Sequence, residues 1–296
     1  MRVGVTGASG FLGKHVVRSL NKEGFEVFSM GISEESDIYL NLHETASVVS
    51  GLKKCAPDYL IHLASPSVQG IYRCEKELNI DEVNALISAE INGAYTLFRL
   101  AGDLGARKII YTSSAAVYGR NENDIPFNEK MVAEPHTLYG TIKLSVEKIG
   151  QSIFSNFVSL RLFQVYGLGD IANRLVPTVI NAKTSNDLQL TPCMQVSDLI
   201  YVKDVAECIC EILKNPLTKG TFNLGYGIPM KLREVVAIIL DVTGNNIVPN
   251  FKEKSYSGDE VMYSYADMSL LFKKMCWRPK YSFIEGLKDF LSDFKL

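Results

Sequence analysis

Tyr139 and Lys143 stand four residues apart in the stretch HTLYGTIKLSVEK, which has the spacing of one helix face. On a helix, residues i and i+4 are neighbours, so the lysine ammonium would lie near the tyrosine ring and hydroxyl. A phenol has an unperturbed pKa near about 10, and a nearby cation favours the phenolate and lowers that pKa. Such a tyrosine can exchange a proton with a substrate oxygen near neutral pH.

The same spacing occurs a second time, at Tyr72 and Lys76, so the spacing alone does not identify an acid/base pair. The stretch YTSSAAVYG distinguishes Tyr139, because it predicts Ser113 and Ser114 at the carboxyl end of a central strand. Ligands bind at that end of open α/β sheets, where a serine hydroxyl can orient the substrate oxygen. Tyr72 has charged neighbours, and no strand that ends in serine precedes it at a suitable distance. We interpret its segment as solvated.

A glycine pattern near the N-terminus predicts a dinucleotide site. VTGASGFLGKHV places Gly7, Gly10 and Gly13 directly after an apolar strand and at the start of a helix. The first glycine permits the tight turn, the second lets the backbone approach a pyrophosphate, and the third lets helix and strand pack closely. The helix N-terminus adds free N–H groups and partial positive charge. The pattern therefore predicts a bound dinucleotide, and the proton exchange at Tyr139 would accompany hydride transfer to or from a nicotinamide.

The cofactor preference depends on the end of the second strand, FEVFSMGIS. NAD-binding folds place Asp or Glu there to bind the ribose 2′-OH, whereas a nearby Arg accommodates the 2′-phosphate of NADP. This strand presents Ser29, Gly31 and Ser33, with neither an acid nor an arginine. Because no carboxylate repels a phosphate and two hydroxyls can bond one, we expect NAD(P) with a small preference for NADP.

Apolar, β-rich runs alternate with segments of helical period through the first half of the chain. Strands are predicted at 2–6, 25–30, 58–64, 108–114 and 156–163, and helices at 11–24, 45–55, about 77–103 and about 136–155. Strands that are apolar almost throughout indicate a parallel sheet covered by helices on both faces. We predict an α/β fold with a Rossmann-type doubly wound parallel sheet at 1–163. A smaller C-terminal substrate-binding domain follows at 164–296, from which part of 198–225 returns to the sheet.

Composition limits the partners. The chain has 296 residues, 47% of them hydrophobic, and a formal net charge of -2 without a Lys/Arg block, which favours a small molecule over nucleic acid or a membrane. No apolar run approaches about 18 residues and the chain enters a strand at once, so we expect a cytoplasmic protein without a signal peptide. Six cysteines without C-x-x-C spacing and four histidines without metal spacing predict reduced thiols and no metal site.

These residues resemble the extended short-chain dehydrogenase/reductases, in particular the NAD-dependent epimerase/dehydratase group of nucleotide-sugar epimerases and 4-ketoreductases. The likeness covers essentially the whole chain, through TGASGFLG, APDYLIHLAS, SSAAVYG, YGTIK, LRLFQVYGLGD, YVKDVA, FNLGYG and the closing ADMSLLFKKMCWRPKYSFIEGLKDF. It implies that Ser114 is the catalytic hydroxyl, Tyr139 the acid/base and Lys143 the cofactor-binding residue that lowers the tyrosine pKa. It also implies a homodimer, joined by a four-helix interface of the helices near 77–104 and 136–155.

The resemblance further assigns ligand contacts. Asn41 falls where the family often has an Asp at the adenine, and Asn92 occupies a familiar Asn position on the long helix. The implied cofactor contacts are Gly7, Ser9, Gly10, Phe11, Leu12, Gly13, Gly31, Ser33, Asn41, Leu42, Leu63, Ala64, Ser65, Asn92, Tyr139, Lys143 and Phe163. The implied substrate contacts are Ser114, Ala115, Gln164, Arg174 and Val176.

Departures from the family pattern bear on the reaction and the substrate. The 4,6-dehydratases carry Asp-Glu after the catalytic Ser/Thr, but this chain has Ala115 and Ala116, so we expect no dehydratase. Gln164 replaces the usual Asn and keeps an amide. Ser197 and Tyr256 stand where arginines normally hold a nucleotide-sugar diphosphate. The cations that are candidates to replace those arginines are Arg161, Arg174, Lys203, Arg233 and Lys254.

We therefore predict an NAD(P)-dependent oxidoreductase or epimerase that acts on a nucleotide-activated sugar, by 4-keto reduction or C4 epimerisation. The compact chain resembles the 4-keto-sugar reductases more than the longer 4-epimerases. Two alternatives stay open. The first is a reductase of a non-nucleotide carbonyl compound, which the missing arginines favour. The second is a non-catalytic cofactor-sensing protein of the same fold, which is disfavoured because Ser114, Tyr139 and Lys143 are all present.

Overall fold

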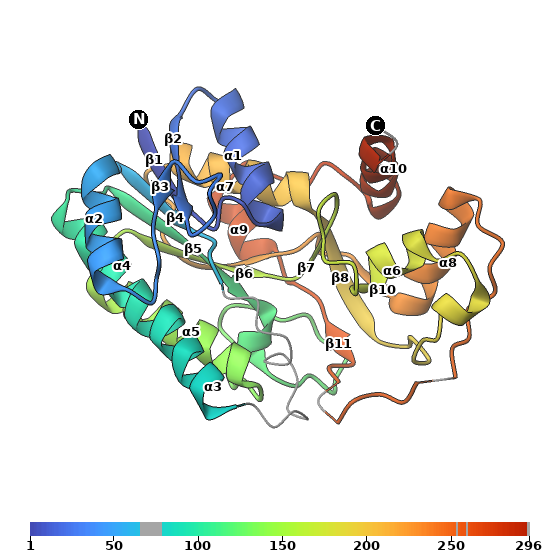
Figure 1. The fold of residues 1–296 in the computed structure, drawn as a ribbon. Helices are drawn as coiled ribbons and strands as arrows, with labels where there is room; N and C mark the ends of the chain where they lie inside the picture. Colours follow the sequence, from blue (N-terminus) through green and yellow to red (C-terminus); the bar gives the residue numbers. More distant parts are fainter. Residues whose placement is uncertain (66–78, 253, 259, 295–296) are drawn as a thin grey trace.

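The structure is a computed structural model that describes residues 1–65, 79–252, 254–258 and 260–294 (Figure 1). The second Tyr/Lys pair, Tyr72 and Lys76, lies outside the described residues, as does Cys74. The elements in chain order are β1 (Arg2–Thr6), α1 (Phe11–Lys22), β2 (Glu26–Gly31), β3 (Ile38–Tyr39), α2 (Thr45–Cys55), β4 (Tyr59–His62), α3 (Ile80–Ile87), the π-helical turn η1 (Ser88–Gly93), α4 (Ala94–Asp103), β5 (Lys108–Ser114), the 3₁₀ turn η2 (Ala115–Tyr118), α5 (Leu138–Ile153), β6 (Phe157–Leu162), β7 (Gln164–Tyr166), α6 (Leu175–Asn181), the 3₁₀ turn η3 (Ser185–Asp187), β8 (Val196–Tyr201), α7 (Val202–Lys214), β9 (Gly220–Leu224), β10 (Pro229–Lys231), α8 (Leu232–Thr243), β11 (Tyr263–Ser264), α9 (Ser269–Lys274) and α10 (Phe283–Phe294).

The main sheet has seven strands in the order β3-β2-β1-β4-β5-β6-β9, and every neighbouring pair is parallel. The order reverses between β1 and β4, which is the switch point where doubly wound folds bind ligands. β9 comes from the second half of the chain and pairs with β6. The predicted Rossmann-type α/β fold is confirmed.

Helices cover both faces of this sheet. Figure 1 shows α2, α4 and α5 on one side, where the side chains of α2, α4, β4 and β5 form one buried cluster. On the other side α1 packs against α7, which carries the buried Cys208 and Cys210. The strands are apolar on both faces because both faces are covered in this way.

The long helix predicted at about 77–103 is the element that differs most from its sequence prediction. It begins at Ile80, because the side chain of Asn79 accepts a hydrogen bond from the Asp81 amide at 2.9 Å and caps the first turn. The π-helical turn η1 then divides it into α3 and α4. Sequence periodicity does not reveal such a turn, since only one turn changes its hydrogen-bond pattern.

The second half of the chain builds a smaller sheet of β7, β8, β10 and β11, flanked in Figure 1 by α6, α8 and α10. Buried Asp198 on β8 holds neighbouring segments to this sheet. Its carboxylate accepts hydrogen bonds from the backbone amides of Tyr226, Gly227 and Ala266 at 2.6 to 3.1 Å. Burial raises the pKa of Asp198 to about 6 despite these three donors.

Three further observations concern the cysteines, metal ions and membrane-crossing helices. The five described cysteines are free thiols, four of them buried and Cys276 exposed. Within the described residues, no group of three His, Cys, Asp or Glu side chains is placed to hold a metal ion. None of the helices in the described part of the chain combines the length and apolarity that crossing a membrane requires.

Candidate functional site

A cavity of about 300 Å³ opens where β1, β2 and β4 end, at the switch point of the sheet. Of the predicted cofactor contacts, those that line this cavity are Gly7, Ser9, Gly10, Gly31, Asn41, Leu42, Leu63, Ala64 and Ser65. The lining residues that sequence reasoning missed are Thr6, Met30, Ile32, Leu40, His43 and Ala89. All of these except Ala89 adjoin predicted residues in the sequence, and Ala89 enters from the π-helical turn.

Gly7 and Gly13 are required by backbone contacts at this cavity. Gly7 has φ +71°, and a Cβ there would lie 2.6 Å from the backbone nitrogen of Ala64 on the β4 side. A Cβ at Gly13 would lie 2.1 Å from the carbonyl oxygen of Gly7, so only glycine lets α1 start this close to β1. The N-terminus of α1 therefore faces the cavity, where its free N–H groups suit a pyrophosphate.

The end of β2 differs from the sequence-based expectation. Asp37 lies beside it, and its carboxylate accepts hydrogen bonds from the amide and the hydroxyl of Ser29 at 2.8 and 2.7 Å. The Ser29 hydroxyl is therefore already hydrogen-bonded within the protein. A carboxylate, that of Asp37, does lie near the end of β2. Ser33 does not line the cavity, and its hydroxyl accepts a hydrogen bond from the Glu35 amide. The contact between Ser29 and Asp37 spans a turn, which a reading of the strand alone could not include.

Asn41 lies in the cavity wall with its amide held by its own loop. The side-chain nitrogen donates to Glu44 at 2.9 Å, and the side-chain oxygen accepts from the His43 amide at 3.1 Å. These two bonds fix the orientation of the amide at the position where an adenine contact was predicted.

A second hollow of about 260 Å³ lies at the end of β5 and contains the predicted catalytic serine. Its lining includes Ser114, Ala115, Ala116, Phe163 and Gln164. None of the described residues that line it is acidic, so no carboxylate is placed there to remove a proton and expel water.

The structure separates the two candidate serines. Ser113 is 3% exposed, whereas Ser114 is half-buried and lines the hollow. The Ser114 hydroxyl accepts a hydrogen bond from the Ala116 amide at 3.2 Å, which fixes its position and leaves its own hydrogen to donate.

Helix α5 begins against this hollow. Thr137 caps it by accepting a hydrogen bond from the Gly140 amide at 3.1 Å. A Cβ at Gly140 would lie 2.4 Å from the Ala116 carbonyl oxygen, so this glycine lets the first turn of α5 rest directly on η2. Tyr139, the residue before Gly140, is thereby brought to the same end of the sheet as Ser114.

Lys143 is 3% exposed and is ion-paired with Glu90, from the π-helical turn η1, at 3.5 Å. Its ammonium lies 5.7 Å from the ring centre of Tyr139 and 5.1 Å from that of Tyr111 on β5. Burial alone lowers the pKa of Lys143, but Glu90 and the two tyrosines outweigh it and raise the pKa above the ordinary lysine value. The predicted neighbourhood of tyrosine and lysine is therefore present, with a carboxylate that sequence reasoning missed.

The same turn contains Asn92, a predicted cofactor contact. Asn92 is exposed and does not line the cavity, whereas Ala89 lines it and Glu90 is buried against Lys143. Ala89 and Glu90 therefore face inward from the π-helical turn η1, and the contact of Asn92 with the cofactor stays a prediction.

Other predicted contacts lie elsewhere. Phe11 lines a separate hollow of about 200 Å³ at the start of α1, and neither Leu12 nor Gly13 lines any of these hollows. Val176 is 1% exposed and packs in the core. Arg174 is paired with Asp170 at 3.5 Å.

Most of the cations proposed to replace the missing arginines are occupied. Arg161 is paired with Glu147, and Lys203 with Asp289 and Asp293. Arg233 stacks over the Phe251 ring at 4.1 Å, and Lys254 is exposed; across the described residues neither has a carboxylate partner. These two residues are the remaining cations of that group in the second half of the chain.

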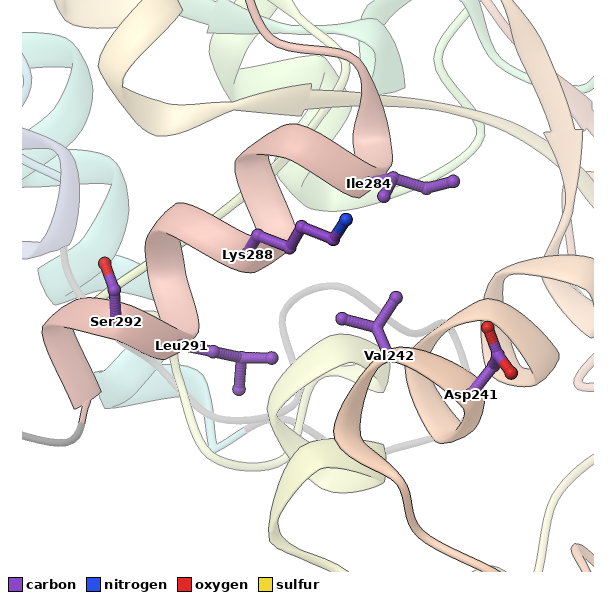
Figure 2. Close-up of a pocket in the computed structure, with 6 residues that line it drawn as sticks. All are labelled: Asp241, Val242, Ile284, Lys288, Leu291 and Ser292. Atoms are coloured by element: carbon purple, nitrogen blue, oxygen red, sulfur yellow. The ribbon is translucent and has the colours of Figure 1, made fainter.

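A hollow of about 580 Å³ between α8 and α10 is the subject of Figure 2. Val242 and Leu291 face each other across it, with Lys288 and Ile284 on α10 and Asp241 on α8. It contains none of the residues that the sequence identifies as candidates for chemistry.

Comparison with known proteins identifies the class to which this fold and site belong. Residues 3–225 match the model of the NAD dependent epimerase/dehydratase family, and the chain belongs to that family. The predicted family membership and the predicted type of enzyme, an NAD-dependent oxidoreductase or epimerase of the extended short-chain type, are confirmed.

Individual relatives match most of the chain. The chain is 28% identical to CDP-abequose synthase of Salmonella muenchen, over 97% of this chain and 96% of the relative. It is 27% identical to GDP-6-deoxy-D-talose 4-dehydrogenase of Aggregatibacter actinomycetemcomitans, over 92% and 90%. The crystal structure of UDP-glucose 4-epimerase from Thermus thermophilus in complex with NAD superimposes with a TM-score of 0.85 at 23% identity, over 100% of this chain and 99% of that one, and supports the fold.

Proposed function

We propose that the protein transfers hydride between a nicotinamide dinucleotide and a sugar carbon of a nucleotide-activated sugar, as a 4-ketoreductase or a C4 epimerase. One observation carries the proposal. Helix α5 brings Tyr139 to the end of the sheet where Ser114 lines a hollow, and the Lys143 ammonium lies 5.7 Å from the centre of the Tyr139 ring. Relatives that match at least 92% of the chain act on CDP-, GDP- and UDP-linked sugars according to their names, which supports the substrate class.

In this proposal each residue has one task. The Ser114 hydroxyl donates to the substrate oxygen, and the Tyr139 phenol exchanges the proton with it. The charged Lys143 stabilises the phenolate form of Tyr139. The cavity at β1, β2 and β4 holds the dinucleotide, with its pyrophosphate at the N-terminus of α1, and the nicotinamide supplies or accepts the hydride. We further propose the division into a dinucleotide-binding part at 1–163 and a mainly substrate-binding part at 164–296.

Reduction and epimerisation differ in their use of the cofactor, which gives the decisive experiment. A reductase consumes one reduced dinucleotide for each 4-keto sugar, whereas an epimerase returns the hydride to the sugar and turns over without added cofactor. We expect stoichiometric oxidation of NADPH or NADH with CDP-, GDP- or UDP-4-keto-6-deoxy sugars. Two negative results together would contradict the proposal: no turnover of any of these 4-keto sugars with reduced dinucleotide, and no turnover of the corresponding 4-hydroxy sugars without added cofactor.

The replacement of two arginines by Ser197 and Tyr256 supports a second candidate, a reductase of a non-nucleotide carbonyl compound. Tyr256 is built into the structure, because its hydroxyl accepts a hydrogen bond from the Met194 amide at 3.1 Å. Thermal-shift measurements with nucleoside diphosphates separate the two candidates. Stabilisation by any of them supports the nucleotide sugar, and no response to all of them supports the second candidate.

A further inference from the structure

Glu90 is a buried carboxylate with a defined partner and no assigned role. It is 2% exposed on the π-helical turn η1, and one of its oxygens lies 3.5 Å from the Lys143 ammonium. The other oxygen is buried and meets no hydrogen-bond donor among the residues that the structure describes. A buried ion pair that is only partly satisfied contributes little to stability, because desolvation offsets the attraction. Stability alone is therefore a poor explanation for this carboxylate.

The place of Glu90 in the fold links it to both parts of the site. η1 lies between α3 and α4, and α4 runs beside α5 (Figure 1). Its residue Ala89 lines the dinucleotide cavity, and Gly93 lets the turn approach the loop before α2, since a Cβ there would lie 2.6 Å from the Leu42 carbonyl oxygen. One irregular turn thus reaches the cofactor cavity and the lysine at once, and π-helical turns are frequent at functional sites.

The surroundings of Lys143 show what Glu90 does to it. The titratable groups that face the ammonium are Tyr139 on the same helix, Tyr111 on β5, His62 on β4 and Glu90 on η1. Burial and the nearby Lys143 lower the pKa of His62 to about 3, so this imidazole is neutral. Glu90 is therefore the carboxylate among these groups, and without it burial would push Lys143 toward the neutral amine.

We propose that Glu90 is a positioning residue of the catalytic site: its carboxylate holds the buried Lys143 in place and in its charged form beside Tyr139. The proposal rests on the function proposed above, since the charged lysine matters there by favouring the tyrosine phenolate. Glu90 acts through Lys143 and needs no contact with the substrate.

The first test is the pH dependence of kcat/KM for wild type and Glu90→Gln. In the variant Lys143 loses its counter-charge and burial shifts it toward the neutral amine, so the limb of the profile that reports Tyr139 moves to higher pH by about one unit or more. Glu90→Asp keeps the carboxylate, so it returns the limb at least halfway to its wild-type pH. Glu82→Gln, the same change at an exposed position on α3, leaves the profile unchanged. A Glu90→Gln profile that overlays wild type or moves to lower pH, or a Glu90→Asp profile that matches Glu90→Gln, overturns the proposal.

The second test needs no activity and therefore separates this proposal from the proposed function. In wild type the raised pKa of Lys143 keeps its contribution to stability constant up to the unfolded value near about 10.4. In Glu90→Gln the folded-state pKa falls below the unfolded one, so stability rises as the pH rises between the two. We expect the difference in Tm between wild type and Glu90→Gln to narrow from pH 6 to pH 9.5. A difference that does not change with pH overturns the role of Glu90, whatever reaction the enzyme performs.

Discussion

At the scale of single residues, the site depends on a phenol, a serine hydroxyl and a buried ammonium. Tyr139 and Lys143 share one face of α5, as the i, i+4 spacing predicts. The sequence could also place Ser114 at a strand end, because a long apolar strand followed by small residues marks that end. It could not show that Ser113 is buried and Ser114 faces the hollow, since this depends on the register of β5 within the sheet.

Tyr139→Phe removes the proton that the proposed reaction exchanges. We expect kcat to fall by roughly 10²- to 10⁴-fold, with dinucleotide binding retained because the ring remains. Steady-state kinetics and isothermal titration with the dinucleotide measure the two effects. Tyr72→Phe, at the other Tyr/Lys pair of the sequence, is the control and should keep wild-type kinetics. Full activity in Tyr139→Phe would refute the acid/base role.

Asp37→Asn tests the cofactor preference at the end of β2. The small preference for NADP stays an expectation: Gly31 supplies no carboxylate to repel a 2′-phosphate, but the Asp37 carboxylate lies beside this edge and opposes that preference. We therefore expect wild type to prefer NADPH over NADH by less than about tenfold, and Asp37→Asn to prefer it more strongly. The measurement is the ratio of kcat/KM for the two cofactors, with exposed Glu34→Gln as the control. An unchanged ratio in Asp37→Asn would show that this carboxylate does not act on the cofactor.

At the scale of secondary-structure elements, α5 is held at two points along its buried face. Its first turn rests on η2 at Gly140, and further along Glu147 forms a two-bond ion pair with Arg161 of β6 at 2.8 and 3.0 Å. Arg161 also lies over the Tyr118 ring of η2 at 4.7 Å. This buried pair therefore ties the helix that carries Tyr139 to the strand beside β5.

Glu147→Gln breaks this pair and leaves a buried arginine without its counter-charge. Because the Glu147 side chain is fully buried and that of Arg161 is 6% exposed, we expect the free energy of unfolding to fall by roughly 3 to 5 kcal/mol. Urea denaturation measures the loss. Asp103→Asn is the matched control, since it breaks an exposed pair with Arg99 on α4 and should cost less than about 0.5 kcal/mol. Equal losses in the two variants would contradict the importance of burial.

At the scale of the whole molecule, we expect a homodimer joined through the helices α3, α4 and α5. Tyr95 is 50% exposed on α4 and Ile80 is 73% exposed at the start of α3, so this surface presents apolar side chains. Light scattering after size exclusion should give twice the chain mass for wild type and one chain mass for Tyr95→Glu. Leu217→Glu, at an 86% exposed position between α7 and β9, should remain dimeric. A monomeric wild type would refute the expectation.

The sequence by itself determined the order of strands and helices, the glycine loop and the Tyr139–Lys143 pair. These features follow from local patterns: apolar runs, helical spacing and glycines at a strand-to-helix turn. Only the tertiary structure decided that Asp37 is hydrogen-bonded to Ser29, that Glu90 is paired with Lys143, and that Arg161 is paired with Glu147. Each of these is a contact between segments far apart in the chain or across an irregular turn. Local periodicity carries no information about such contacts, because packing alone brings the partners together.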